Sequence, residues 1–213
     1  MNQIKKLKYL ENLSYFNKVT LEQYYDLSKN GLYANINRWL KQGALIQLRK
    51  GLYVSPRYLQ TLPDKQPYCE FIANKLREPS YLSLEYVLQK YSILTEAVYA
   101  FTSITLKCKR TYRNSLGTFV YRNLKEDLFT GFKILSRGQF EIKEATKAKA
   151  LFDYLYLKTF RIPVISKEFL TSLRLNLDEM TTKDFLEFSK YCKQSGVKKY
   201  SKLPKLLEDL RYD

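Results

Sequence analysis

The amino-acid sequence predicts an α+β fold in two domains: a small N-terminal domain of helices and a hairpin, then a mixed helix–antiparallel sheet domain with C-terminal helices. Helical spacing of apolar residues in residues 20–43 changes to strand-like alternation in residues 46–54. A polar, proline-punctuated stretch, residues 56–67, then marks a boundary. Short strand-like runs follow, and helical spacing returns near residue 145. We therefore expect domains at residues 1–60 and 67–213.

The first domain begins with helices. A helix from Ile4 to Phe16 packs behind the others in this interpretation. The next starts at Thr20 and ends at Asn30-Gly31, because Asn and Gly tolerate the left-handed conformation of a helix exit. A further helix ends just before Gly43, and its apolar residues fall at core spacing: Ile36, Trp39 and Leu40.

A small basic hairpin follows these helices. Residues 46–49 and 52–54 alternate like strands, and Lys50-Gly51 between them is a tight turn in which Gly supplies the positive φ. Two helices followed by such a hairpin form the plan of a winged helix-turn-helix. The first domain is therefore predicted to be a DNA-binding unit of this kind.

If Ile36, Trp39 and Leu40 of the helix before Gly43 face inward, the polar residues of that helix face outward. Asn and Arg read the edges of adenine and guanine in the major groove, and a hairpin tip contacts phosphate or the minor groove. The predicted DNA-binding residues are Tyr33, Asn35, Asn37, Arg38 and Lys41 on the helix, with Arg49 and Lys50 at the hairpin tip. The alternative is a solvated basic face used for protein contacts.

Charge favours an anionic partner. The chain has 37 Lys and Arg against 21 Asp and Glu, a formal net charge of +16, and its isoelectric point is near 9.6. Such an excess speeds encounter with nucleic acid and releases counterions from phosphates. We expect double-stranded DNA, rather than a membrane, as the partner.

Several site classes are excluded by what the sequence lacks. Without histidine there is no Ser-His-Asp or Cys-His catalysis and no His-containing zinc site. The three cysteines are isolated and form no CxxC pair. Adjacent carboxylates such as Glu126-Asp127 point to different sides of an element, so they rarely share a metal ion. We expect no cofactor, no metal and no catalytic residue.

No secretory signal or membrane span is expected either. The basic N-terminus is not followed by an apolar core, and no run approaches the roughly 18 apolar residues of a membrane span. A cytoplasmic protein is predicted.

The second domain is predicted to begin with a helix over residues 68–76 and a second helix capped by Ser83. Strands are expected at residues 97–106, 110–112, 118–124, 132–135 and 140–142, with turns at 114–117 and 136–138. A helix then starts at Ala145, and three more cover residues 166–175, 182–194 and 203–211.

A second set of basic residues brackets the turn at Gly117. A ribbon with Arg and Tyr can contact phosphate and stack on bases. Alternating basic residues are equally the ordinary outer face of an antiparallel sheet. The members of this possible second basic surface are Lys107, Lys109, Arg110, Arg113 and Arg122.

Several segments resemble a known family when taken in order. They are Leu48-Arg49-Lys50-Gly51-Leu52-Tyr53, Pro79 to Glu85, Val98-Tyr99 with Thr102-Ser103, Leu116 to Phe119, Tyr121-Arg122, and Lys149 to Tyr154. This set resembles the AbiEi-type antitoxins and transcriptional regulators of bacterial abortive-infection loci, from about Thr20 to about Leu157.

The resemblance implies a winged helix that binds operator repeats and represses its own operon. It also implies a C-terminal antitoxin domain that opposes a nucleotidyltransferase toxin, generally without a stable complex. We therefore expect an autorepressor and antitoxin of a type IV toxin–antitoxin system. The alternatives are a metal-dependent nucleic-acid-processing enzyme and a protein-binding module that sequesters a toxin directly.

Overall fold

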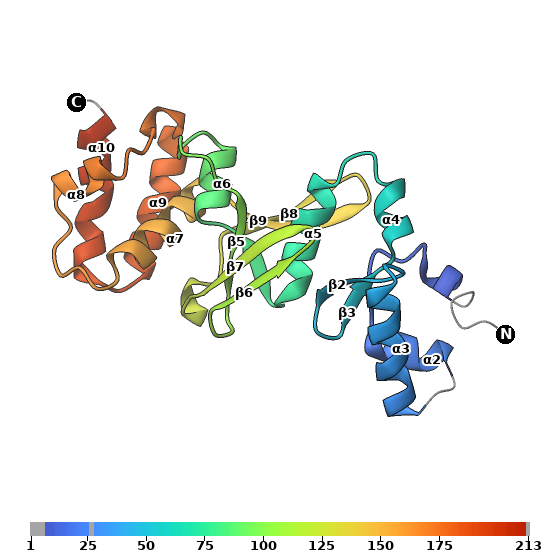
Figure 1. Cartoon of the computed structure of the whole chain (residues 1–213). Coiled ribbons are helices and arrows are strands. Elements are labelled where there is room, and N and C mark those ends of the chain that lie inside the picture. The colour runs from blue at the N-terminus through green and yellow to red at the C-terminus, as the bar shows by residue number, and fades with distance from the viewer. Residues whose placement is uncertain (1–6, 26–27, 212–213) are drawn as a thin grey trace. The chain divides into compact units, whose positions relative to one another are not determined.

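The computed structural model of the chain describes residues 7–25 and 28–211. It divides into two compact units (Figure 1). Unit 1 comprises Met1–Cys69 with Tyr112–Gly117, and unit 2 comprises Glu70–Thr111 with Thr118–Asp213. Helices and strands occur in both, which confirms the predicted α+β class.

Unit 1 is built on a small sheet of three strands. Its elements are the 3-10 helix η1 (Leu7–Leu10), β1 (Phe16–Asn17), α2 (Lys18–Tyr24), α3 (Lys29–Lys41), β2 (Ile46–Arg49), β3 (Leu52–Val54) and α4 (Pro56–Thr61). The sheet order is β1-β3-β2, and both pairs are antiparallel. The helix expected from Ile4 to Phe16 is wrong in its described part, because η1 is short and Phe16 pairs with Tyr53 in the sheet. Residues 4–6 lie outside the described residues.

One face of α3 closes the core of unit 1. The cluster contains Leu10, Leu21, Leu32, Ile36 and Trp39, all at most 2% exposed. The ring of Trp39 lies 5.0 Å from that of Tyr25. Leu40, predicted to be in the core, packs against this cluster and is partly buried.

The start of α3 differs from the prediction, and its end agrees. Ser28 caps the helix by accepting a hydrogen bond from the amide of Gly31 at 3.2 Å, so Asn30-Gly31 opens α3 rather than ending α2. At the other end Gly43 has φ of +68°, and the amides of Gly43 and Ala44 donate to the carbonyls of Leu40 and Trp39. This pair of backbone hydrogen bonds is common at helix ends where a glycine adopts the left-handed conformation.

Unit 2 contains a mixed sheet of six strands in the order β6-β7-β5-β4-β9-β8. The purely antiparallel sheet that was predicted is wrong, because β4 is parallel to β9 and β5 is parallel to β7. The strand between β5 and β7 in the chain, β6, lies outside β7, and the strand before β9, β8, lies outside β9. The chain therefore returns parallel to an earlier strand in both places. The bounds are β4 (Ser80–Leu82), β5 (Ala100–Thr105), β6 (Arg110–Asn114), β7 (Gly117–Asn123), β8 (Phe132–Arg137) and β9 (Phe140–Ala145).

Helices α7 to α10 gather together at the C-terminal end of unit 2 (Figure 1). The remaining helical elements are α5 (Gln66–Leu76), α6 (Glu85–Lys90), η2 (Glu126–Leu128), α7 (Lys147–Thr159), α8 (Lys167–Ser172), η3 (Leu177–Glu179), α9 (Thr182–Gln194), η4 (Lys198–Lys202) and α10 (Leu203–Arg211). In the described part of the chain, no helix has the length and apolar character needed to cross a lipid bilayer.

Ser83 does not cap α6 as predicted. The residue before α6 is Leu84, and the Ser83 hydroxyl donates instead to the carboxylate of Asp153 at 2.8 Å. Thr181, in contrast, caps α9 by a reciprocal pair of hydrogen bonds with Asp184.

Candidate nucleic-acid interface

The outward face of α3 carries most of the predicted DNA-binding residues. Leu32, Ile36 and Trp39 are buried on the other face, so the helical period turns Tyr33, Asn37 and Lys41 to solvent on successive turns. Arg38 is also exposed. Within α3 there are three basic residues and no acidic one, so the helix itself contributes only positive charge.

Asn35 is half-buried and already hydrogen-bonded within α3. Its side-chain amide donates to the carbonyl of Gly31 at 2.8 Å, and its carbonyl oxygen accepts from the guanidinium of Arg38. In this arrangement Asn35 holds Arg38 rather than offering a free amide to a base.

The β2–β3 hairpin presents a single free cation at its tip. Gly51 has φ of +81°, which allows the two-residue turn, and the Lys50 side chain is exposed. Arg49 is half-buried, and its Nη1 donates to the carbonyl of Lys50 at 3.2 Å. The amide of Asn114, also in unit 1, donates to the carbonyl of Leu48 at 2.8 Å and so fixes β2. Lys50 is therefore the hairpin residue best placed to contact phosphate.

Lys18 joins this basic face, although the sequence pattern did not single it out. Its ammonium lies 4.1 Å from the centroid of the Tyr33 ring and 3.1 Å from a carboxylate oxygen of Glu22. Hydrogen bonding with Tyr33, then with Glu22, raises the pKa of Lys18, so it stays charged at neutral pH. The i,i+4 spacing of Lys18 and Glu22 was the available signal.

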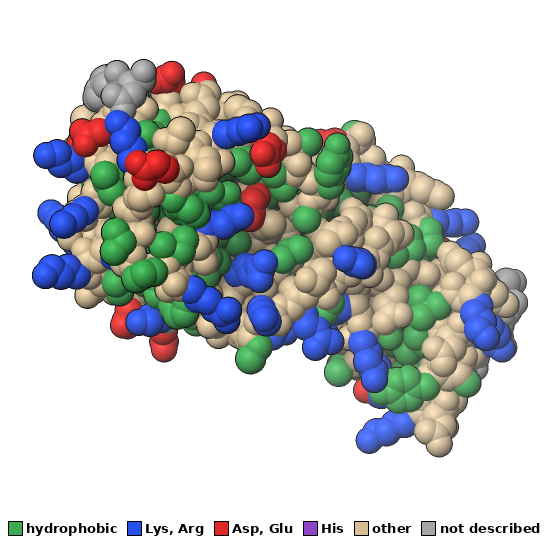
Figure 2. Space-filling model, turned by 60° about the vertical axis from the view of Figure 1, so that its left-hand side comes forward, with side chains coloured by type: hydrophobic (Ala, Val, Ile, Leu, Met, Phe, Trp, Pro, Cys, Tyr) green, Lys and Arg blue, Asp and Glu red, His purple; other side chains and the backbone are tan. Residues whose placement is uncertain are grey.

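The surface charge agrees with this local picture. Residues 1–69 contain eleven Lys and Arg against four Asp and Glu. Figure 2 shows Lys and Arg side chains distributed across the visible face of the molecule.

The possible second basic surface is divided among different places. Lys107 and Lys109 lie in the β5–β6 connection and Arg110 lies on β6, all three exposed. The side-chain amide of Asn123 holds this connection through the carbonyls of Leu106 at 3.0 Å and Lys107 at 3.2 Å. Arg113 belongs to the segment assigned to unit 1, and Arg122 lines a cavity in unit 2.

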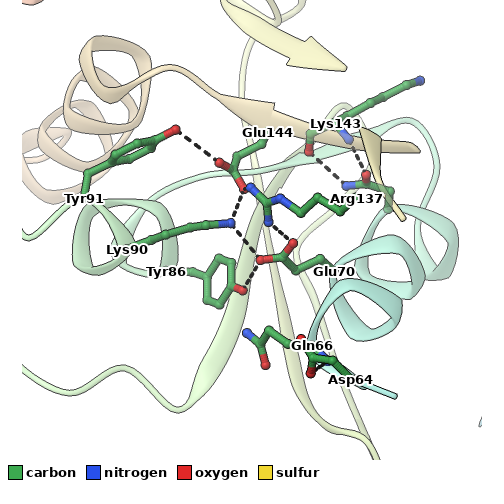
Figure 3. Close-up of polar contacts among 10 residues, drawn as sticks. Asp64, Gln66, Glu70, Tyr86, Lys90, Tyr91, Arg137, Lys143 and Glu144 are labelled. Atoms are coloured by element: carbon green, nitrogen blue, oxygen red, sulfur yellow. Dashed lines mark hydrogen bonds and ion pairs between the residues drawn. The ribbon is translucent and has the colours of Figure 1, made fainter. Parts of the chain in front are cut away.

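A buried ionic network in unit 2 was not predicted. Figure 3 shows Glu70, Lys90, Arg137 and Glu144 converging from α5, α6, β8 and β9. The Lys90 ammonium lies 2.8 Å from both carboxylates, and Arg137 also bridges the two. The hydroxyl of Tyr86 donates to Glu70 at 2.5 Å. Burial lowers the pKa of Arg137, but Glu144 and Glu70 outweigh it, and the net pKa is raised. The network ties together four elements.

A second buried cluster lies on α7. Lys149 and Asp153 are ion-paired and fully buried, and Asp153 also accepts from the hydroxyls of Tyr81 at 3.0 Å and Ser83 at 2.8 Å. Burial raises the pKa of the Asp153 carboxyl, although the ammonium of Lys149 opposes this. The Asp153 carboxylate thus accepts three hydrogen bonds from buried groups of the protein, which is typical of a structural network.

Carboxylates do not gather into a metal site in the described residues. Glu126 and Asp127 lie exposed on η2. Comparison with protein-family models gives no matching family, and comparison with curated proteins gives no match.

Proposed function

We propose that the protein is a DNA-binding repressor whose unit 1 is a winged helix-turn-helix. The observation that carries this proposal is α3, which buries one face in the core and exposes another that has amide, guanidinium and ammonium groups but no carboxylate. The preceding helix α2 and the following hairpin have the order of that motif.

The exposed residues have two kinds of role in this proposal, base contact and backbone contact. Arg38 reads a guanine and Asn37 reads an adenine, since these side chains match the donor and acceptor pattern of those bases. Lys41 and Tyr33 contact the sugar–phosphate backbone beside the groove, and Lys50 contacts phosphate from the hairpin tip.

The operator and the wider role follow from the resemblance to AbiEi-type antitoxins. On that basis the chain represses its own operon and opposes a nucleotidyltransferase toxin encoded alongside. Co-expression with the neighbouring reading frame tests this: restored growth supports the antitoxin role, and growth arrest despite expression of both chains contradicts it. Stable co-purification of the two would favour direct sequestration instead.

Fluorescence anisotropy on duplex DNA from upstream of the operon tests the interface. Arg38→Ala should cost about 1–3 kcal/mol and relax specificity at one base pair. Lys50→Ala should weaken binding to all duplexes alike and reduce the salt slope by about 0.9. Arg57→Ala is the control, because Arg57 is an exposed arginine of α4 that pairs with Glu11 at 3.2 Å. Unchanged affinity and specificity in the Arg38 variant would refute the assignment of α3.

A further inference from the structure

Unit 2 contains a cavity on one face of the β5–β7 pair. These strands are parallel, with Ala100 opposite Thr118 and Thr102 opposite Val120. All four residues line the cavity, together with Arg122 two positions farther along β7. Because side chains alternate along a strand, these residues share one face of the sheet. Its volume, about 510 Å³, lies within the roughly 300–1,000 Å³ usual for small-molecule sites.

Three separate segments form the sides of this cavity. They are the turn into α6 at Leu84-Glu85, the connection from Leu94 to Tyr99, and the side chains of Tyr154 and Lys158 on α7. Leu84, Glu85, Arg122, Tyr154 and Lys158 also line an adjoining hollow of about 290 Å³. Arg122 and Lys158 therefore lie at the same end of the site.

The wall at Leu84 is held in a strained conformation. Leu84 has φ of +62°, a backbone angle that residues other than glycine rarely adopt. The hydroxyl of Thr102 enforces it, donating to the carbonyl of Ser83 at 2.6 Å and accepting from the amide of Tyr86 at 3.0 Å. Strain that the surrounding structure maintains concentrates at binding sites, and here the residue that maintains it is part of the cavity floor.

The charged side chains of the cavity are not paired with one another. Among the described residues, Glu85, Glu96, Arg122 and Lys158 form no hydrogen bond or ion pair. Lys158 lies 5.3 Å from the centroid of the Tyr154 ring. Burial raises the pKa of Tyr154, and the negative charges of Glu85 and Glu96 raise it further. Both carboxylates are therefore close enough to the Tyr154 hydroxyl on α7 to affect it electrostatically.

An aromatic side chain stands at the rim. Tyr99 lines the cavity and is 91% exposed. An exposed ring of this kind has no role in the core, and its flat face is free to stack on a planar ligand.

We propose that this cavity binds a nucleoside phosphate, either as a free nucleotide or as one unit of a single strand. Arg122 and Lys158 hold the phosphate, because a guanidinium and an ammonium are the usual partners of phosphate oxygens. Glu85 and Glu96 accept hydrogen bonds from ribose hydroxyls or from base amino groups, since ionised carboxylates only accept. Tyr99 stacks on the base.

The mixture of groups distinguishes this ligand from simpler anions. Inorganic phosphate would use the two cations but would be repelled by the two carboxylates. A nucleoside without phosphate would leave both cations unpaired. Only a ligand with an anionic end, several donors and a planar body uses every group. The site is in unit 2, so it does not depend on the proposed function of α3.

Isothermal titration calorimetry on the full chain tests this assignment. The probes are the 5′-monophosphates of the four ribonucleosides, the corresponding nucleosides, inorganic phosphate, and 5′-phosphorylated trinucleotides. We expect Arg122→Gln to weaken binding about tenfold or more and Tyr99→Ala about fivefold. Arg161→Gln is the matched control, because Arg161 is an exposed arginine outside the cavity.

The probes separate the two sources of the ligand. Tight binding of a monophosphate identifies a free nucleotide, and binding of the trinucleotide alone identifies a strand; both support the proposal if Arg122→Gln reduces them. The proposal is overturned if neither probe binds, if inorganic phosphate binds as tightly as a nucleotide, or if Arg122→Gln and Arg161→Gln behave alike.

Discussion

Removing Arg137 should expose how strongly unit 2 depends on its buried ionic network. In Arg137→Met, the carboxylates of Glu70 and Glu144, 2% and 0% exposed, would share the single cation of Lys90. Breaking a buried ion pair from one side costs about 3–5 kcal/mol, because a buried charge is left uncompensated. The side chain of Arg137 is 24% exposed, so water reaches the gap that it leaves. We therefore expect a loss near the lower end, about 3 kcal/mol.

Urea unfolding followed by far-UV circular dichroism measures this loss. With a slope of about 1.5 kcal/mol per molar, the midpoint should fall by about 2 M. Lys133→Met is the control, since Lys133 is an exposed residue of the same strand, β8, and its loss should matter by no more than about 0.5 kcal/mol. Arg137→Lys keeps the charge but offers one nitrogen in place of two, so it should fall between the two variants.

The comparison of the variants identifies the cause. Lys133→Met also removes one positive charge from β8, but it leaves the ion pairs of Glu70 and Glu144 in place. A deficit of Arg137→Met equal to that of Lys133→Met would refute this reasoning.

Two further substitutions and one labelling experiment have definite expected outcomes. Gly43→Ala should destabilise unit 1 by about 1 kcal/mol, because a side chain is disfavoured at φ of +68°, even though no other atom would lie within 4 Å of the added Cβ. Trp39 fluorescence during urea unfolding measures this loss, and an unchanged unfolding curve would contradict the prediction. Asn35→Ala should reduce discrimination at the base that we propose Arg38 contacts, because the guanidinium loses its intrahelical partner, while binding of unrelated duplexes stays constant. Equal loss on both kinds of duplex, by anisotropy, would count against a positioning role. In native buffer only the exposed thiol, Cys108, should react rapidly with an aromatic disulfide reagent, and a second fast equivalent would contradict the burial of the other two.

Local features were predictable from the sequence where one residue type decides them. Gly43 ends α3, Lys50-Gly51 forms a turn, and Thr181 caps α9, each because few other residues satisfy the backbone there. The error at Asn30-Gly31 has the same origin: the signal permits a helix end but does not require one. The nearby serine, Ser28, supplied a cap and turned the pair into a helix start.

Strand order could not be predicted in this way. The alternation in residues 118–124 indicates a strand with two faces, and it is the same whichever neighbour the strand pairs with. Whether β7 lies beside β5 or only beside β6 depends on long-range packing. The hydroxyl of Tyr121, for example, donates to the carbonyl of Ala73 at 2.5 Å, and no local pattern links these two residues.

The polar networks were missed for a related reason. Lys149 and Asp153 have the i,i+4 spacing of an ordinary surface pair, yet both are fully buried. Glu70 and Glu144 are 74 positions apart in the chain, so neither signals the other. Burial of a charge depends on what the fold brings to it, whereas the exposure of Arg38 and Lys41 follows from the period of one helix.

This difference explains why α3 is the part of the chain most informative about function. Folding of the helix depends on its buried residues, Leu32, Ile36 and Trp39, and on its two ends. Folding does not restrict which side chains occupy the exposed positions of α3. Charges of either sign would keep the helix soluble. The exposed positions of α3 carry cationic and amide side chains and no carboxylate, and this composition is the basis of our proposal that the helix contacts DNA.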